Sequence, residues 1–92
     1  MNNQDILFIP DTALISSVGD EMIILEINSG KYIEFNSVAG KIIDLIRAKK
    51  TIAYKNLLIN LSEFYDIDIN SINIDVEEFI NQALKIEVLR KK

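Results

Sequence analysis

The sequence predicts an α+β domain in which a three-stranded antiparallel sheet is followed by three helices. Apolar residues alternate with a period of two up to Phe35, and after Asn36 they recur with a period near 3.6. Strands and helices are therefore segregated along the chain, which favours an antiparallel sheet over a parallel one with crossover helices. Nothing repeats and no linker interrupts the chain, so we expect one domain over residues 1–92, with residues 1–12 as a flexible lead-in.

The predicted strands lie near residues 13–18, 21–27 and 31–35. Pro10 lacks a backbone donor, so the apolar run before it is expected to be an edge or lead-in segment. Gly19-Asp20 and Asn28-Ser29-Gly30 predict the turns between the strands, because Gly and Asn tolerate positive φ.

Each strand has two faces in this prediction. In the second strand one face carries Ile23, Leu25 and Ile27, and the opposite face carries Met22, Ile24 and Glu26. In the third strand Ile33 and Phe35 share a face. We expect the core to contain Ile23, Leu25, Ile33, Phe35, Ile42, Leu45, Leu58, Leu61 and Phe79.

Capping residues predict where the helices begin. Asn36 or Ser37 would start a helix that runs to about Ala48, and Thr51 would start a second one. Residues 66–71 are expected to be a loop. Asp75 with Glu78 three residues later resembles a capping box and would start the third helix. Residues 88–89 would add a last extended turn.

The composition argues against catalysis. In 92 residues, 49% are hydrophobic and 26% charged, as in ordinary folded domains, but Cys and His are both absent. Disulfides, thiolate chemistry and the commonest general base are thereby excluded. Asp66, Asp68 and Asn70 alternate oxygen ligands, but the sixth position of that stretch lacks the glycine of an EF-hand loop. We expect a protein that is not an enzyme, with no metal and no cofactor.

The charge and the terminus bear on partners and location. The net charge is −4, which is the wrong sign for binding phosphates, so we expect no nucleic-acid partner. No apolar stretch approaches the 18 or more residues of a membrane span, and Met1–Asp5 lacks the basic start of a signal peptide. The expectation is a cytoplasmic protein with no membrane partner.

Surface geometry offers a binding site instead. The strand at 31–35 ends the predicted sheet, so it has an open edge at which another strand can add. The third helix must cover part of the sheet, and a groove between the two could hold an extended peptide. From the pattern alone, the simpler alternative is that this edge is covered by the protein itself.

A family resemblance favours the groove. The stretch from Asp20 to Asn36 reads as an aliphatic strand, a turn ending in Gly30, an aromatic-bearing strand and an Asn that leads into a helix. With the Thr-initiated second helix and the pattern at 75–80, it resembles the PqqD-like family over roughly residues 13–89. Two departures are Phe35, where Leu is usual, and Glu87, where Gly is frequent.

The resemblance implies a winged helix-turn-helix-like domain called a RiPP recognition element. Such domains bind the leader segment of a ribosomally synthesised precursor peptide and present it to a leader peptidase, a cyclase or a radical SAM enzyme, as in lasso peptide biosynthesis. The leader would lie as an extra strand on residues 31–35, with its side chains directed towards the third helix. The implied peptide-binding residues are Lys31, Tyr32, Ile33, Glu34, Phe35, Val76, Phe79, Ile80 and Ala83.

Two other functions remain open at this point. Winged-helix domains also bind DNA, although residues 71–92 hold four acids and four bases, three of these bases in the tail. A structural or neutralising subunit is compatible with the acidic charge. We expect a monomer or a weak homodimer.

Overall fold

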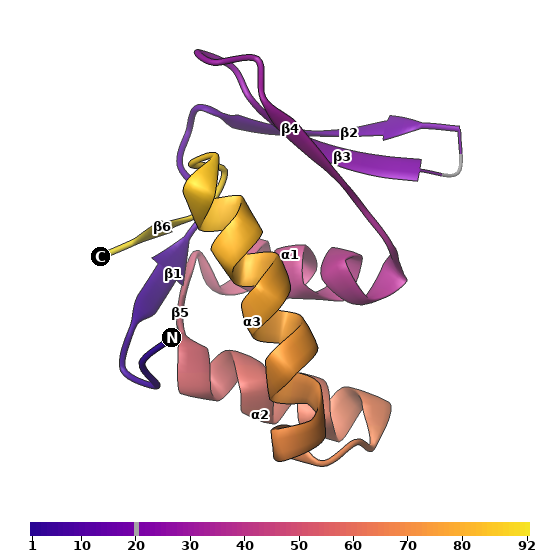
Figure 1. Cartoon of the computed structure of the whole chain (residues 1–92), viewed down its shortest axis with the longest axis vertical. Coiled ribbons are helices and arrows are strands. Elements are labelled where there is room, and N and C mark those ends of the chain that lie inside the picture. The colour runs from indigo at the N-terminus through magenta and orange to yellow at the C-terminus, as the bar shows by residue number, and fades with distance from the viewer. Residues whose placement is uncertain (20) are drawn as a thin grey trace.

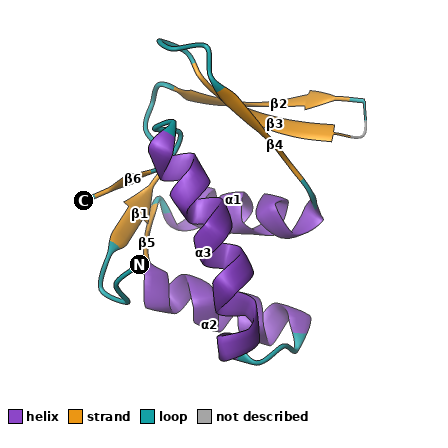
Figure 2. Cartoon of the chain, viewed as in Figure 1, coloured by secondary structure: helices purple, strands orange, loops and turns teal. Residues whose placement is uncertain are grey.

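The computed structural model describes residues 1–19 and 21–92, so the predicted turn at Gly19-Asp20 lies partly outside it. Two small sheets lie against a group of three helices, one above the helices and one at their left in the view of Figures 1 and 2. The elements in chain order are β1 (Ile6–Phe8), β2 (Ala13–Val18), β3 (Glu21–Glu26), β4 (Tyr32–Phe35), α1 (Ser37–Lys49), β5 (Thr51–Ala53), α2 (Tyr54–Tyr65), α3 (Ile69–Lys85) and β6 (Arg90–Lys91).

The predicted antiparallel sheet is confirmed. It has the order β2-β3-β4, and its strands end within one residue of the expected positions. Gly30 closes the β3–β4 turn with φ +73°, a conformation that glycine adopts without strain. Figure 1 shows this sheet above α1, with β4 descending into the start of that helix.

The face of β3 that enters the core is the opposite of the predicted one. Ile24 is fully buried and lies directly between Ile15 and Ile33, whereas Ile27 is 51% exposed. The prediction that Ile23 and Leu25 are core residues is therefore wrong. Both faces of β3 are rich in apolar residues, so a period of two could not tell them apart. The packing of the core against the face that carries Ile15, Ile24 and Ile33 decided which face is buried.

The helices follow the prediction in number and order but not in all boundaries. For α1 the prediction holds, and the Asn36 side chain accepts a hydrogen bond from the Ala39 N–H at 3.0 Å. Thr51 does not cap α2, because it belongs to β5. The third helix begins at Ile69, where Asp68 accepts from the Asn70 N–H at 3.1 Å.

Two expectations about α3 are consequently wrong. Residues 69–71 are helical rather than loop, and Asp75 with Glu78 lies inside the helix instead of capping it. Asn70 and Ser71 favour turns as readily as helix starts, which concealed the first turn of α3. The buried stripe of α3 is Ile72, Val76, Ile80 and Ala83.

A second sheet, with the order β5-β1-β6, was not predicted. Its strands have three, three and two residues, too few to show a period. Residues 1–12, expected as a flexible lead-in, contain its central strand, and Leu7 there is fully buried. Val88 and Leu89 are fully buried just before β6. The sheet joins the two ends of the chain to the segment between α1 and α2.

The core prediction is confirmed for Ile42, Leu58 and Leu61, which are at most 4% exposed. Four other predicted core residues are only partly buried and pack against the core from its edge. These are Ile33, Phe35, Leu45 and Phe79.

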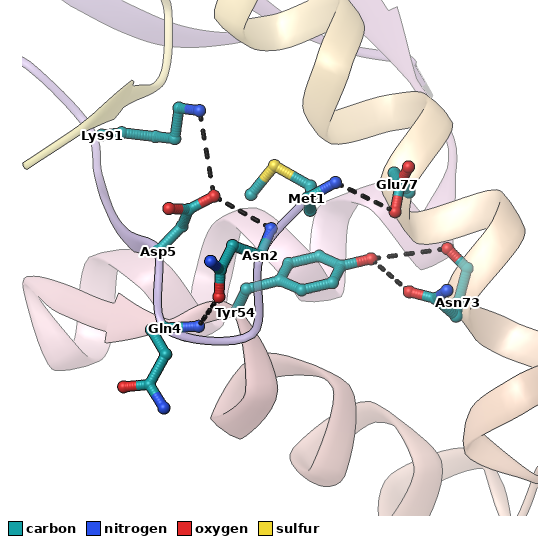
Figure 3. A network of polar contacts seen from close by, with 8 residues as sticks. All are labelled: Met1, Asn2, Gln4, Asp5, Tyr54, Asn73, Glu77 and Lys91. Atoms are coloured by element: carbon teal, nitrogen blue, oxygen red, sulfur yellow. Dashed lines mark hydrogen bonds and ion pairs between the residues drawn. The ribbon is translucent and has the colours of Figure 1, made fainter.

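Polar contacts behind α3 attach it to α2 and to the N-terminal segment (Figure 3). The Tyr54 hydroxyl donates to Asn73 Oδ1 at 2.6 Å, and the Met1 ammonium lies 3.3 Å from Glu77 Oε2. Burial, with a smaller contribution from Glu77, raises the pKa of Tyr54 to about 12, so its hydroxyl is protonated and can donate. These contacts fix the side of α3 that faces away from β4.

Candidate functional site

A groove of about 350 Å³ lies between β4, the first turns of α1 and the middle of α3. Its volume is within the range of small ligand sites, and its long walls are a strand and a helix. The lining residues are Ile33, Glu34, Phe35, Asn36, Val38, Ala39, Ile42, Asp75, Val76, Glu78, Phe79 and Gln82.

The β4 wall of this groove has an open backbone edge. Among the described residues, β4 pairs only with β3, on one side. The Glu26 N–H donates to the Lys31 carbonyl at 2.8 Å, which identifies Glu26 and Lys31 as a hydrogen-bonded pair of the ladder. Such pairs alternate along antiparallel strands, so Ile33 and Phe35 direct their backbone groups to β3. Tyr32 and Glu34 direct theirs outward.

Two aromatic rings join the walls of the groove. Phe35 on β4 and Phe79 on α3 have ring centroids 6.4 Å apart and pack edge to face. Phe35 also packs over α1 at Gly40, where a Cβ would lie 3.7 Å from the ring, in ordinary van der Waals contact. The floor of the groove is accordingly apolar and half-buried.

The rim of the groove is acidic. Glu34, Asp75 and Glu78 are exposed side chains in its lining, and Gln82 continues their line along α3. No Lys or Arg is among the lining residues. The groove thus combines an apolar floor, negative charge and unpaired backbone groups of β4.

The predicted site residues are divided by the structure. Ile33, Glu34, Phe35, Val76 and Phe79 line the groove. Lys31 and Tyr32 are exposed on the same chain segment but outside the lining.

Ile80 and Ala83 lie elsewhere. They are fully buried in the core and do not line the groove. Placing a carboxylate at Ala83 would therefore destabilise the core and would not probe binding in the groove.

Some lining residues were missed by the sequence analysis. On α3 the missed positions are Asp75, Glu78 and Gln82, whose spacing of three and four residues places them on one helical stripe beside Phe79. On α1 they are Val38, Ala39 and Ile42, with the capping residue Asn36. The α3 stripe could have been read from the helical spacing, whereas the approach of α1 depends on tertiary packing.

A second, larger cavity of about 580 Å³ lies on the other side of Phe35. It is lined by Ile15 and Met22 from the sheet and by Phe64 and Tyr65 from α2, and the Lys41 ammonium lies 4.1 Å from the centre of the Phe64 ring. Its lining includes neither the outward-facing residues Tyr32 and Glu34 nor any residue of α3.

The chemistry available to the groove is binding. Among residues 1–19 and 21–92, no cluster of three metal-ligating side chains occurs, and no helix there has the length and apolarity to cross a membrane. The groove offers hydrogen-bonding backbone, apolar contact and negative charge, which together suit an extended peptide.

Comparisons with known proteins agree with this geometry. The family model described as Coenzyme PQQ synthesis protein D (PqqD) matches residues 21–89. The fold resembles the solved structure of TbiB1 in complex with the TbiA(beta) leader peptide, with a TM-score of 0.75 and 19% sequence identity, over 90% of this chain and 94% of that one. No curated protein matches the chain.

Proposed function

Because the chain belongs to the PqqD family, we propose that it binds the leader segment of a ribosomally synthesised precursor peptide without catalysing a reaction. It delivers that peptide to modifying enzymes, such as a leader peptidase with its cyclase or a radical SAM enzyme, in the cytoplasm. The observation that carries the proposal is the open edge of β4 beside an apolar groove.

The leader adds to β4 as a fourth strand in this proposal. The outward N–H and C=O groups of Tyr32 and Glu34 pair with its backbone, and this pairing supplies affinity that depends little on sequence. Phe35, Phe79 and Val76 receive its apolar side chains and supply specificity. TbiB1, whose fold is similar, is described in a complex with a leader peptide, which supports this mode of binding.

The remaining predicted residues act indirectly in this mode. Lys31 precedes the pairing segment, which begins at Tyr32. Ile80 and Ala83 are fully buried, so they pack α3 against the core and do not contact the leader. Residues 1–92 act as one binding domain in this proposal, and the acidic groove disfavours DNA as a partner.

A proline at position 34 tests the backbone pairing. Glu34→Pro removes the outward N–H, and Glu34→Ala is the matched control that removes the same side chain but keeps the donor. The probe is the fluorescein-labelled leader of a precursor peptide encoded beside the gene, and binding is followed by fluorescence polarisation. We expect Glu34→Pro to weaken binding at least tenfold relative to Glu34→Ala, since a backbone hydrogen bond and its neighbours are lost.

Thermal unfolding of both variants separates binding from folding. Glu34→Pro should remain folded, because the lost N–H points away from β3 and makes no bond within the sheet. Equal leader affinity of the folded Pro and Ala variants would contradict strand addition at β4. Absence of leader binding by the parent protein would contradict the proposed function itself.

A further inference from the structure

We propose that the groove selects leader segments in which apolar residues alternate with Lys or Arg. This inference rests on the proposed function, since it takes a strand added to β4 as its starting point. It concerns the class of sequence that fits there, and its evidence is the distribution of charge and apolar surface around the groove.

The positions that point into the groove must be apolar. Residues directly opposite one another on neighbouring strands share a face of the sheet. Leader residues opposite Ile33 and Phe35 therefore point to the core side, where Phe79 and Val38 line the groove. A side chain there loses its water, so an aliphatic or aromatic residue is favoured and a charged one is excluded.

The position between them faces an acid. Glu34 alternates with Ile33 and Phe35, so its exposed side chain lies on the outer face of β4. A leader residue directly opposite Glu34 lies on that same face, within the reach of cross-strand charge pairing. Lys or Arg at this position forms an ion pair, and Asp or Glu is repelled.

The opposite wall of the groove has the same sign. Asp75 and Glu78 are exposed on one stripe of α3, and no basic residue lines the groove beside them. Ion pairs among the described residues involve Glu77 and Asp5, and neither Asp75 nor Glu78 takes part in them. The two acids therefore repel an acidic leader side chain that points into the groove.

Charge around this groove contributes more to selectivity among leader sequences than to binding affinity. An exposed ion pair contributes little, about two- to fivefold in affinity for each pair. Repulsion of like charges adds to the discrimination, because an acidic leader residue would meet Glu34 on the outer face of β4, or Asp75 and Glu78 if it pointed into the groove. Backbone pairing and the apolar floor supply most of the binding in both cases.

The experiment is a selection from an mRNA-displayed library of random twelve-residue peptides against the immobilised full chain. Peptides that also bind Glu34→Pro are discarded, which leaves those that depend on the β4 edge. We expect the remaining pool to contain Lys and Arg at alternate positions, at twice their frequency in the library or more. The same selection on Glu34→Gln should lose most of this excess, because the basic residues lie on the outer face of β4, opposite Glu34.

A charge-matched control separates the groove from the overall acidity of the protein. Glu63→Gln removes one exposed acid outside the groove lining and should keep the basic excess. Loss of the excess in this control as well would overturn the proposal, since net charge alone would then explain it. The most enriched peptide, with each base replaced by Gln, should bind two- to fivefold more weakly per replacement, and less so in 0.5 M salt.

Two failures can be told apart. A pool that depends on the β4 edge but has no excess of Lys and Arg overturns the charge selectivity and leaves leader binding intact. A pool that never becomes dependent on the β4 edge overturns strand addition, on which both proposals rest.

Discussion

At the turn between β3 and β4, a buried carboxylate stabilises the hairpin that carries the open edge of β4. Glu26 is only 4% exposed, and its two carboxylate oxygens accept from the Asn28 N–H at 3.2 Å and the Ser29 N–H at 2.8 Å. Donation by the Ser29 N–H lowers the pKa of Glu26 below its ordinary value of 4.5, and burial opposes this only in part. Glu26, on the core face of β3, therefore stabilises the β3–β4 turn.

Stability should depend on pH through Glu26. Because its folded pKa is lowered, the ionised carboxylate stabilises the fold above the unfolded value near 4.5, and this contribution is lost as pH falls through the folded pKa. Glu26→Gln should therefore be less stable than the parent at pH 7, with a smaller difference at pH 3. Urea midpoints measure it, and the exposed Glu21→Gln on the same strand is the control. A Glu26→Gln difference that is equal at both pH values would contradict this role.

Phe79 stands at the boundary between core and groove, and its two roles can be separated. The side chain is half-buried, so Phe79→Ala should cost about 1–2 kcal/mol of stability, less than the ~3–5 kcal/mol of a full core position. Leader affinity should fall about tenfold, because the floor loses the ring that packs on Phe35.

The control is Phe64→Ala, which removes an exposed ring from the other cavity and should leave leader affinity unchanged. Urea denaturation and fluorescence polarisation with the same labelled leader measure both quantities. A loss of stability near 4 kcal/mol with unchanged affinity would place Phe79 in the core alone.

At the scale of elements, the groove exists because β4 and α3 are held apart by different partners. β4 is paired to β3 and leads directly into α1, whereas α3 is fastened on its far side through Asn73 and Glu77 (Figure 3). The edge-to-face contact between Phe35 and Phe79 joins them. The groove therefore lies between two elements that are each supported elsewhere.

Amide exchange along β4 should alternate residue by residue. In the free protein the Tyr32 and Glu34 amides point away from β3 and should exchange fast, whereas those of Ile33 and Phe35 are bonded to β3 and should exchange slowly. Adding leader peptide should slow Tyr32 and Glu34 at least tenfold and change Ile33 and Phe35 little. Hydrogen–deuterium exchange read by NMR resolves the four amides. Protection of Tyr32 and Glu34 in the free protein would mean that the edge is already covered.

At the scale of the whole molecule, the second sheet closes the fold. β1 lies between β5 and β6, so residues near both ends of the chain pair at one place beside the helices (Figure 2). Leu7 on β1 and Leu89 before β6 are both fully buried in the same core cluster. The segment before Pro10 is therefore part of the domain on which the groove depends.

Two leucine truncations test this role. Leu7→Ala should cost about 2–5 kcal/mol of stability, because it leaves a cavity at a fully buried position. Leu14→Ala, at a position that is 50% exposed on β2, should cost less than about 1 kcal/mol. Urea denaturation of both variants measures the contrast. Equal, small effects would mean that β1 contributes little to the fold.

The sequence alone was sufficient for features that depend on local periodicity and turn chemistry. The three strands of the larger sheet, the turn ending at Gly30 and the cap of α1 at Asn36 are encoded within a few residues. That β4 ends the meander also follows from chain order, whereas the groove was favoured by the family resemblance and not by the pattern alone. These features need no knowledge of distant contacts.

Tertiary structure decided the rest. Whether Ile23 or Ile24 enters the core depends on which face of the sheet packs against the core cluster, because β3 is apolar on both faces. The strands β1, β5 and β6 are too short to form without one another, so no local sequence pattern predicts them. In the same way, Asp75 and Glu78 became groove residues only when α3 packed opposite β4. The role of a charged residue on a helix depends on which element packs opposite it, and local sequence order does not determine that packing.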